Sequence, residues 1–399
     1  MRRVVITGMG SISALGHDAP TCWQAMREGR SGIGTISAVA PELLKAPIAA
    51  EVRGFDPLQH FDEKKLMLLD RVSQFALVAA REAVAQSGLD FRTGGLGDTT
   101  ACIIGTGVGG ENTNDQASRR LYGENNPRLH PLTIVRLMAN APVSQVCIEF
   151  GLTGPAFAVS SACASANHAM AQAFHMVRSG MADTAVTGGT EACITYGVAR
   201  AWEAMRVLAD DTCRPFCKQR RGLVLGEGAG IFVLEEYEHA RRRGATILAE
   251  FAGAGMSSDA ADIVFPSRDG AASAIQRALT DARMNTDDVD YINAHGTGTP
   301  ANDSTETAAI RQVFGAHADA LAVSSTKSMH GHALGAAGAI ELIAAIGALR
   351  NGVMPPTANF IDPDDVQERQ LQWRELRHHV TVERGRIVVL SGRIARVHR

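Results

Sequence analysis

The sequence of 399 residues lacks the usual signals of a secreted, membrane-spanning or metal-caged protein. No apolar run approaches the ~20 residues that span a bilayer. Arg2-Arg3 is followed only by residues 4–7 before Gly8, too few apolar residues for a signal peptide. The net charge of −3 argues against a general nucleic-acid binder. The cysteines are scattered, odd in number and without Cys-x-x-Cys spacing, so we expect a reducing, cytoplasmic compartment and no zinc cage; they are Cys22, Cys102, Cys147, Cys163, Cys193, Cys213 and Cys217.

Apolar residues and glycine are plentiful. A hydrophobic content of 45% and a charged content of 20% provide for a sizeable core, and the length suits one two-part unit or two domains. Glycines cluster after predicted strands, as in α/β folds that bring backbone close to a ligand. Two such turns, at residues 8–10 and 105–110, are only weak matches to nucleotide-binding loops because the full fingerprint is missing. A tight turn beside a cleft is the better interpretation.

Residues 154–176 place a cysteine where a strand passes into a helix. The apolar run at residues 156–159 follows a Gly-Pro turn and predicts a buried strand, and the Ala-rich run beyond Ser160 and Ser161 predicts a helix. Cys163 therefore lies in or near the first helical turn, where free N–H groups and the helix dipole lower a thiol pKa. Small neighbours leave room for a substrate to reach the sulfur. The alternative is a buried, inert cysteine, the common state of a free thiol.

The second half of the chain repeats the order of the first. A predicted helix, strand and Gly/Thr loop at residues 271–299 match those at residues 73–107. Ala322-Val323-Ser324-Ser325 mirrors Ala158-Val159-Ser160-Ser161, and a small-residue helix follows each. These pairs predict a duplicated α/β module. One half, over residues 1–250, carries Cys163, and the other, over residues 251–399, carries His295 and His332. Equivalent loops then bring Cys163, His295 and residues 327–332 into one crevice.

Candidate partners for Cys163 lie in the second half. His295 ends a predicted strand, where side chains project from the carboxyl end. His330 and His332 follow the mirror strand, and without a third ligand of clear spacing we expect no metal there. Glu341 lies in a helix that is apolar nearly all round, so its carboxylate needs a partner, for which Lys327 is suited. A structural histidine or a solvated carboxylate is the alternative in each case.

Together these motifs resemble those of the β-ketoacyl-acyl-carrier-protein synthases, the condensing enzymes of bacterial fatty-acid and polyketide synthesis. The resemblance implies an α/β fold of the thiolase type, five-layered (α-β-α-β-α), and usually a homodimer. The matching segments follow the family's order over about residues 1–363: Val4-Val5-Ile6-Thr7-Gly8-Met9-Gly10, Ser161-Ala162-Cys163-Ala164-Ser165, Gly188-Gly189-Thr190-Glu191, Arg214-Pro215-Phe216, Leu225-Gly226-Glu227-Gly228-Ala229-Gly230, Asn293-Ala294-His295-Gly296-Thr297-Gly298-Thr299, Ser325-Thr326-Lys327-Ser328-Met329 and, after Gly331-His332, Leu334-Gly335-Ala336-Ala337-Gly338-Ala339-Ile340-Glu341.

The resemblance also implies catalytic roles. Cys163 is implied as the acyl-accepting nucleophile. His295 and His332 are implied as donors that bind the malonyl thioester carbonyl and stabilise the enolate formed when carbon dioxide leaves. Lys327 and Glu341 are implied to hold the electrostatics and geometry around the histidines. The residue types fit a Claisen condensation, which needs a covalent thioester and N–H donors aimed at developing oxyanions.

The implied partners follow from the same chemistry. Thr297 and Thr299 are implied to meet the phosphopantetheine arm of acyl carrier protein, which delivers acyl-ACP and malonyl-ACP. No cofactor is implied beyond that arm. The second subunit is an identical chain or a related one, and the pathway is fatty-acid, polyketide or specialised acyl-chain synthesis.

The match departs from the family at three places. Cys217, Gln219 and Arg221 replace acidic residues in the loop after Phe216. His330 stands where Thr usually precedes Gly-His; synthases of specialised acyl chains are similar there and at Asn302-Asp303. From about residue 366 a basic tail replaces the family's Gly-Phe-Gly-Gly-x-Asn loop, which gates the acyl pocket and helps form the oxyanion hole.

We interpret this tail as out of register with the ancestral coding frame, with a divergent tail as the alternative. Re-reading the gene in its other two frames tests the idea. Loss of one oxyanion donor predicts a drop in turnover of about 10²–10³.

Two other functions remain open at this stage. A catalytically impaired partner subunit, of the chain-length-factor type, shares the fold; the tail favours it, and Cys163 with both histidines argues against it. A thiolase acting on coenzyme A needs a second cysteine as base, and none stands near His332 in the sequence.

Overall fold

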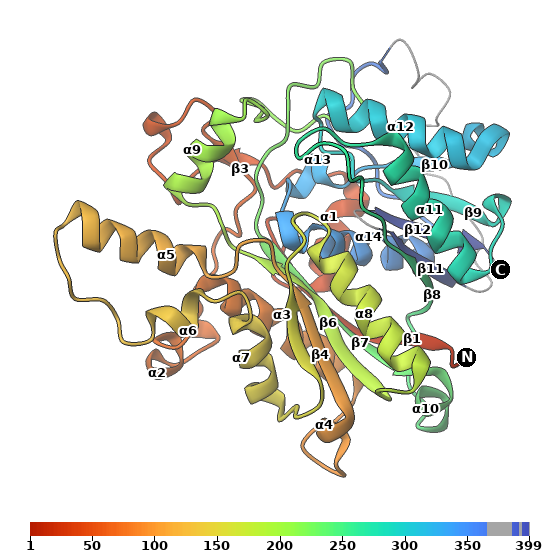
Figure 1. Ribbon diagram of the computed structural model, residues 1–399, viewed down its shortest axis with the longest axis horizontal. Coiled ribbons are helices and arrows are strands. Elements are labelled where there is room, and N and C mark those ends of the chain that lie inside the picture. Colours follow the sequence, from red (N-terminus) through yellow and green to blue (C-terminus); the bar gives the residue numbers. More distant parts are fainter. Residues whose placement is uncertain (365–384, 391–392, 399) are drawn as a thin grey trace.

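The computed structural model describes residues 1–364, 385–390 and 393–398, the last two ranges by their backbone alone. Residues 365–384 of the basic tail lie outside the described residues. That the tail is read out of frame, and that it lacks the Gly-Phe-Gly-Gly-x-Asn loop, therefore stay predictions from the sequence. In the described part, one mixed sheet has the order β10-β9-β12-β11-β8-β1-β7-β6-β4-β5 (Figure 1).

Five strands at one end of this sheet come from the N-terminal part of the chain and form the first set. Their order is β5-β4-β6-β7-β1; β4 is parallel to β5 and β6, and β7 is antiparallel to both neighbours. Their bounds are β1 (Val4–Ser13), β4 (Thr100–Gly105), β5 (Ala156–Val159), β6 (Thr184–Glu191) and β7 (Gly228–Glu236).

The other five strands follow in the order β8-β11-β12-β9-β10, and β1 joins the two sets by pairing Val4 with Phe251 on β8. The final hairpin departs from the repeat: β11 is parallel to β8 and β12 is antiparallel to β9. In the first set the strand beside β4 is β6, which precedes β7 in the chain and is parallel to β4. In the second set the strand beside β9 is β12, the last strand in the chain. The bounds are β8 (Ala249–Gly255), β9 (Val289–Asn293), β10 (Ala322–Ser324), β11 (Gly385–Leu390) and β12 (Arg393–His398).

The helices complete five layers around these strands. α3 and α7 cover the outer face of the first set, and α11 and α12 lie outside the second, while α8 and α14 lie between them (Figure 1). The longer helices are α1 (Ala19–Glu28), α3 (Arg71–Ser87), α5 (Glu111–Ser118), α7 (Ala141–Phe150), α8 (Ser165–Ser179), α9 (Tyr196–Ala204), α11 (Arg268–Ala282), α12 (Pro300–Phe314) and α14 (Ala337–Asn351); the shorter ones are α2 (Glu63–Leu66), α4 (Leu96–Thr99), α6 (Thr133–Leu137), α10 (Tyr237–Arg242) and α13 (Lys327–His330). A small pair, β2 (Gly34–Thr35) and β3 (Ile48–Ala49), stands apart.

The core is largest around the middle layer. Ala, Leu and Ile side chains of α14 pack with Met170 and Phe174 of α8 and with Phe232 and Phe251 of the strands. Each fully buried Leu, Ile or Phe contributes about 1.5–3 kcal/mol. An Ala-rich helix that is apolar on every side fits a buried position between the two sets of strands. By length and composition the stretch Leu334–Asn351 could also cross a membrane, but 89% of it is buried in this core.

The predicted elements agree with the structure, with two corrections. The glycine turn predicted at residues 8–10 is wrong, because β1 continues through these residues to Ser13. The alternation of strands and helices confirms the α/β class, and β5 occupies the predicted residues. The prediction that β5 is a buried strand is wrong: Ala156 and Phe157 are exposed and Ala158 and Val159 half-buried. The reason is that β5 is the edge of the sheet, with only β4 beside it.

Candidate active site

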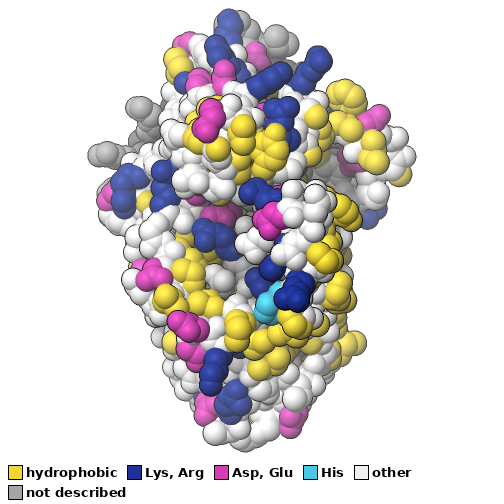
Figure 2. All heavy atoms as spheres, turned by 90° about the vertical axis from the view of Figure 1, so that its left-hand side faces the viewer, with side chains coloured by type: hydrophobic (Ala, Val, Ile, Leu, Met, Phe, Trp, Pro, Cys, Tyr) yellow, Lys and Arg dark blue, Asp and Glu magenta, His cyan; other side chains and the backbone are white. Residues whose placement is uncertain are grey.

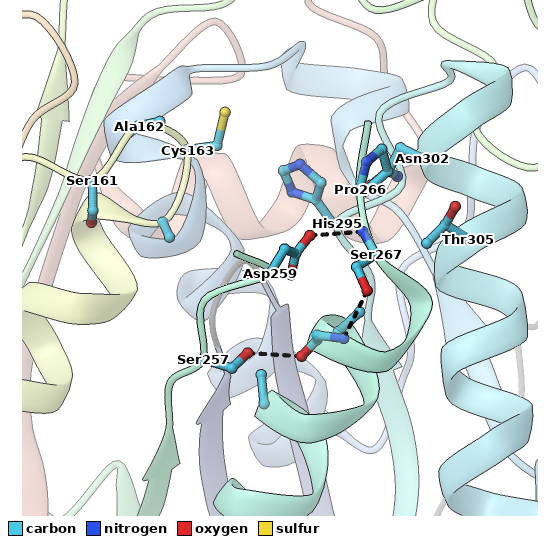
Figure 3. Close-up of a pocket in the computed structure, with 14 residues that line it drawn as sticks. Ser161, Ala162, Cys163, Ser257, Asp259, Pro266, Ser267, His295, Asn302 and Thr305 are labelled. Carbon is cyan, nitrogen blue, oxygen red and sulfur yellow. Dashed lines mark hydrogen bonds between the residues drawn. The ribbon is translucent and has the colours of Figure 1, made fainter. Parts of the chain in front are cut away.

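A cavity of about 290 Å³ lies where the ends of several elements converge (Figure 3). Cys163 approaches it from the β5–α8 junction and His295 from the end of β9. The remaining wall comes from the segment before α11 and from α12. It includes Asp259, Ser267, Asn302 and Thr305. The nucleophile and one histidine expected from the sequence therefore share one opening.

The backbone bends sharply just before Cys163. Ala162 has φ 51, in the left-handed region that alanine rarely adopts, at a cost of order 1 kcal/mol or more. Ser165 holds this bend: its Oγ donates to the carbonyl oxygen of Ala162 at 2.6 Å and accepts from the N–H of Ser161 at 2.9 Å. The bend places the thiol at the cavity rather than inside α8. No role was predicted for Ser165 from the sequence. Its position two residues after the candidate nucleophile was the available indication that it supports the bend.

The thiol of Cys163 is harder to ionise than expected. Burial raises the pKa of Cys163 to about 11, and the positive charge of Lys327 opposes this only in part. The expectation that the helix end lowers this pKa is therefore wrong for the unliganded protein. The physical reason is that removing water from a thiolate outweighs the partial charge of a helix that begins at Ser165. The resting nucleophile is a thiol at neutral pH.

His332 lies directly against the nucleophile. Its Nε2 is 3.0 Å from Sγ of Cys163. Burial, reinforced by the charge of Lys327, holds the pKa of His332 well below its usual range, so the ring is neutral. Gly331 has φ 65, and this turn separates His332 from His330. His330 is fully buried elsewhere, with its Nε2 3.0 Å from Oγ1 of Thr326.

His295 completes the group from the other side. Its ring stands edge-on to that of His332, with centroids 5.3 Å apart. Ligand atoms of Cys163, His295 and His332 all lie within 4.8 Å of one another, so one small group can contact all three. These three side chains also form the set that could hold a metal ion among the described residues, rather than the His330–His332 pair considered from the sequence.

Two buried acids on α12 position the loop that carries His295. Glu306 accepts the N–H groups of His295 and Gly296, both at 2.8 Å. Asp303 accepts the N–H of Gly298 in the same loop at 3.2 Å, and burial raises the pKa of Asp303 to about 6. Neither role was predicted from the sequence. The available signal was two acids three residues apart in the first turns of a helix that follows a Gly/Thr loop.

The ion pair expected between Lys327 and Glu341 is present. Lys327 Nζ donates to Oε1 of Glu341, and both side chains are at most 1% exposed. A buried pair of this kind adds little net stability but leaves an uncompensated charge when one partner is removed. It keeps a fixed positive charge near the thiol and His332, as the pKa shifts of both show.

Glu191 ties the two copies of the module together. Its carboxylate accepts the N–H groups of Gly107 at 2.7 Å and Gly335 at 2.9 Å, which come from different halves. A Cβ on Gly335 would stand 2.2 Å from the nitrogen of Gly107, so the approach requires glycine. Burial raises the pKa of Glu191 to about 7. Glu191 belongs to the Gly188-Gly189-Thr190-Glu191 motif, but no role was predicted for it from the sequence.

Thr297 and Thr299 lie beside this group without lining the cavity. Their hydroxyl groups contact each other at 2.9 Å, and Thr299 caps α12 by accepting the N–H of Asn302. Thr297 is 4% exposed. A phosphopantetheine arm therefore has to exchange with existing hydrogen bonds to reach either hydroxyl.

Most of the chain matches models of known protein families. Residues 1–240 match the family model "Beta-ketoacyl synthase, N-terminal domain" and residues 248–361 the model "Beta-ketoacyl synthase, C-terminal domain". The second match ends just before the basic tail. Nodulation protein E of Rhizobium sp. (strain N33) is 50% identical over 369 residues, 91% of this chain and 90% of the relative.

Two further comparisons cover similar lengths. The 3-oxoacyl-[acyl-carrier-protein] synthase 2 of Staphylococcus aureus (strain COL) is 41% identical over 370 residues, 91% of this chain and 89% of the relative. Among solved structures, the ishigamide ketosynthase/chain length factor superposes with a TM-score of 0.90 at 34% identity, covering 99% of this chain and 98% of that one.

Proposed function

The chain belongs to the β-ketoacyl synthase family and is a condensing enzyme of the acyltransferase class, and we propose that Cys163, His295 and His332 carry out its reaction. The predicted family and its thiolase-like fold are confirmed. The observation that carries the proposed roles is the 3.0 Å contact between the Cys163 sulfur and His332, with His295 beside them; Cys163 and His295 line the cavity.

In the first half-reaction the acyl group moves to Cys163. The sulfur attacks the carbonyl carbon of an acyl thioester, the bond to the pantetheine sulfur breaks, and the proton of the Cys163 thiol leaves with that departing thiol. A thiol with a pKa of about 11 suits a site in which the proton moves only when the thioester is bound. The neutral ring of His332 stabilises the sulfur without competing for its proton.

In the second half-reaction a malonyl thioester loses carbon dioxide. The electron pair of the broken carbon–carbon bond forms an enolate, whose oxygen accepts N–H bonds from His295 and His332. Each such donor lowers the barrier by about 3 kcal/mol. The enolate carbon attacks the acyl group, the bond to Cys163 breaks, and the sulfur takes up a proton. Burial, together with the charge of Lys327 that Glu341 holds in place, keeps the ring of His332 neutral.

The relatives support a proposal for the carrier and for the acyl chain. A relative that is 41% identical is named for acyl carrier protein, so we propose acyl-ACP and malonyl-ACP as substrates, with Thr297 and Thr299 contacting the phosphopantetheine arm. Identity is higher, at 50%, with nodulation protein E. This difference, with His330 and Asn302 at positions that vary in the family, supports a specialised acyl chain as product. The seven free cysteines support a reducing, cytoplasmic location.

We also propose that the enzyme works as a dimer across β5. Phe157 on this edge strand is 38% exposed, and apolar side chains near α6 are also exposed, among them Ile134 at 64% and Val135 at 55%. Figure 2 looks onto the side of the molecule that carries α5 and α6 and shows hydrophobic groups interspersed with Lys and Arg. An unpaired apolar edge is a template for a second strand. The second subunit is a copy of this chain, or a related chain as in a ketosynthase/chain length factor pair.

A two-step assay tests the proposal. Radiolabelled acyl-ACP transfers its label to the protein in the first step, and malonyl-ACP releases carbon dioxide in the second. Cys163→Ala abolishes labelling, a loss of about 10⁴–10⁶-fold, while Cys147→Ala, a half-buried cysteine outside the cavity, retains it. Labelling without carbon dioxide release contradicts a condensing enzyme, and absence of labelling in the wild type favours a catalytically impaired partner subunit.

A further inference from the structure

The thiol of Cys163 and the imidazoles of His295 and His332 are also good ligands for a soft metal ion. We propose that Cys163, His295 and His332 together bind Zn²⁺ or a similar thiophilic divalent cation, which reversibly blocks the enzyme. Binding follows from the geometry of these side chains alone. That it blocks condensation rests on the function proposed above.

The distances are close to those of a tetrahedral site. Bonds of about 2.3 Å to sulfur and 2.0–2.1 Å to imidazole nitrogen place sulfur and nitrogen about 3.5 Å apart around zinc, and two nitrogens about 3.3 Å apart. Nε2 of His332 is 3.0 Å from the sulfur of Cys163, and all three ligand atoms lie within 4.8 Å of one another. The ligand atoms therefore lie near tetrahedral spacing, and rotation of the side chains has to bring them onto it.

The donor set selects the metal. One thiolate with two imidazoles favours Zn²⁺, Co²⁺ and Cd²⁺ over Mg²⁺ and Ca²⁺, which require oxygen ligands. Coordination replaces the proton of the thiol: Cys163–SH and Zn²⁺ form Cys163–S–Zn⁺ and release one H⁺. No electron transfer is involved. Uptake of the metal therefore releases one proton per chain, and the released proton is itself measurable.

The fourth coordination position faces the cavity. Cys163 and His295 line this space of about 290 Å³, which leaves room for a water or another small ligand on the metal. Nδ1 of His332 has no hydrogen-bond partner among the described residues, so no carboxylate or carbonyl of that part orients the ring. Outer partners of this kind change metal affinity about 10–100-fold. Their absence from the described part favours reversible binding over a structural metal.

The surrounding charge opposes a cation only in part. Lys327 repels it, but Lys327 is already paired with Glu341, and Glu191 lies close enough to act on Cys163. The sum of these charges is near zero or negative. A bound metal ties up the sulfur and both imidazoles, so it excludes acyl transfer and enolate stabilisation at once.

Co²⁺ is the probe of choice because its spectrum reports the ligands. We expect the purified full chain, without substrate, to take up one Co²⁺ with a thiolate-to-cobalt band and visible bands typical of tetrahedral geometry. Zn²⁺ bleaches the spectrum, whereas excess Mg²⁺ leaves it unchanged. Cys163→Ser and wild type alkylated at Cys163 both lose the thiolate band, His295→Ala and His332→Ala weaken it, and Cys147→Ala retains it.

Enzyme activity is measured in a separate assay, so that the metal site and the proposed function can each be refuted without the other. Zn²⁺ lowers both half-reactions of the carrier-protein assay at least tenfold, and a chelator restores them. A thiolate band that persists in Cys163→Ser, no band in the wild type, or equal competition by Mg²⁺ overturns the metal site. A normal cobalt spectrum on a protein without transferase activity retains the metal site and overturns the proposed function instead.

Discussion

Two strand-to-helix junctions of this molecule have the same sequence pattern and opposite environments. Ala158-Val159-Ser160-Ser161 leads from β5 to Cys163 and α8, and Ala322-Val323-Ser324-Ser325 leads from β10 to residues 327–332 and α14. Residues 156–164 are exposed or half-buried, whereas every residue from 321 to 349 is buried. Near-identical strand ends therefore do not predict equal access to solvent.

The two junctions therefore supply different parts of the site. The exposed junction presents a thiol where a carrier-bound thioester can reach it. The buried junction contains a lysine, a glutamate and two histidines, whose charges act strongly because water is absent. The predictions below test this division, beginning with the largest effect.

Breaking the buried ion pair has the largest expected effect on stability. Lys327→Ala removes the positive charge beside the buried carboxylate of Glu341 and lowers the free energy of unfolding by about 3–5 kcal/mol, measured by urea denaturation. Arg221→Ala, which removes a largely exposed ion pair with Asp210, is the control and leaves the midpoint unchanged.

The double variant Lys327→Met with Glu341→Leu separates stability from catalysis. Removing both charges restores most of the lost stability. Carbon dioxide release stays below that of the wild type, because the positive charge near Cys163 and His332 is also removed. If the double variant is as active as wild type, the electrostatic role assigned to this pair is refuted.

Removing the imidazole of His332 separates the half-reactions. We expect His332→Ala to retain acyl labelling of Cys163 in part, while carbon dioxide release falls about 10²–10³-fold because one enolate donor is lost. Both steps are followed with the carrier-protein assay. His317→Ala, a histidine that contacts the carbonyl oxygen of Val289 away from the cavity, is the matched control. An equal loss of both half-reactions contradicts the assigned role.

The buried histidines make stability depend on pH. Burial, with the charge of Lys327, lowers the pKa of His330 to about 3, against about 6.5 in the unfolded chain. Between these values the unfolded state binds more protons, so the contribution of His330 to stability falls by about 1.4 kcal/mol per pH unit as the pH decreases below 6.5. Asp303 and Glu191, with raised pKa values, act in the opposite direction.

Comparison of the wild type with His330→Gln isolates the histidine. Urea denaturation between pH 4.5 and 6.5, chosen to lie between the two pKa values, is expected to show a shallower acid decline for the variant. Parallel curves for the two proteins rule out a neutral buried imidazole at this position.

The smallest effect is expected at the exposed junction. Ser165→Ala removes two hydrogen bonds that hold the bend at Ala162 and lowers stability by about 1 kcal/mol. A comparable loss in transition-state positioning slows acyl transfer about fivefold, and Ser165→Thr is expected to restore part of it. Ser179→Ala, at the other end of α8, changes neither quantity. A change in stability without any change in acyl transfer means that Ser165 has no positioning role.

Local pattern predicted much of the fold. The bounds of β5, the helix after Cys163 and the repeat of strand and helix follow from periodicity and small-residue runs, which act over a few residues. The same reasoning placed Lys327 beside Glu341, since a charged residue in an apolar helix needs a partner. It failed for the burial of β5 and for the pKa of Cys163, because both depend on what the rest of the chain places around them.

The sequence by itself determined the family, the residue types of the site and the elements that carry them, because motifs and periodicity are local properties. Only the tertiary structure decided that Cys163 meets His332 across 169 positions of the chain, that Glu191 bridges two loops, and that one junction is open while its twin is buried. Those outcomes arise from the stacking of layers, which sets distance, solvent access and dielectric at each residue irrespective of its neighbours in sequence.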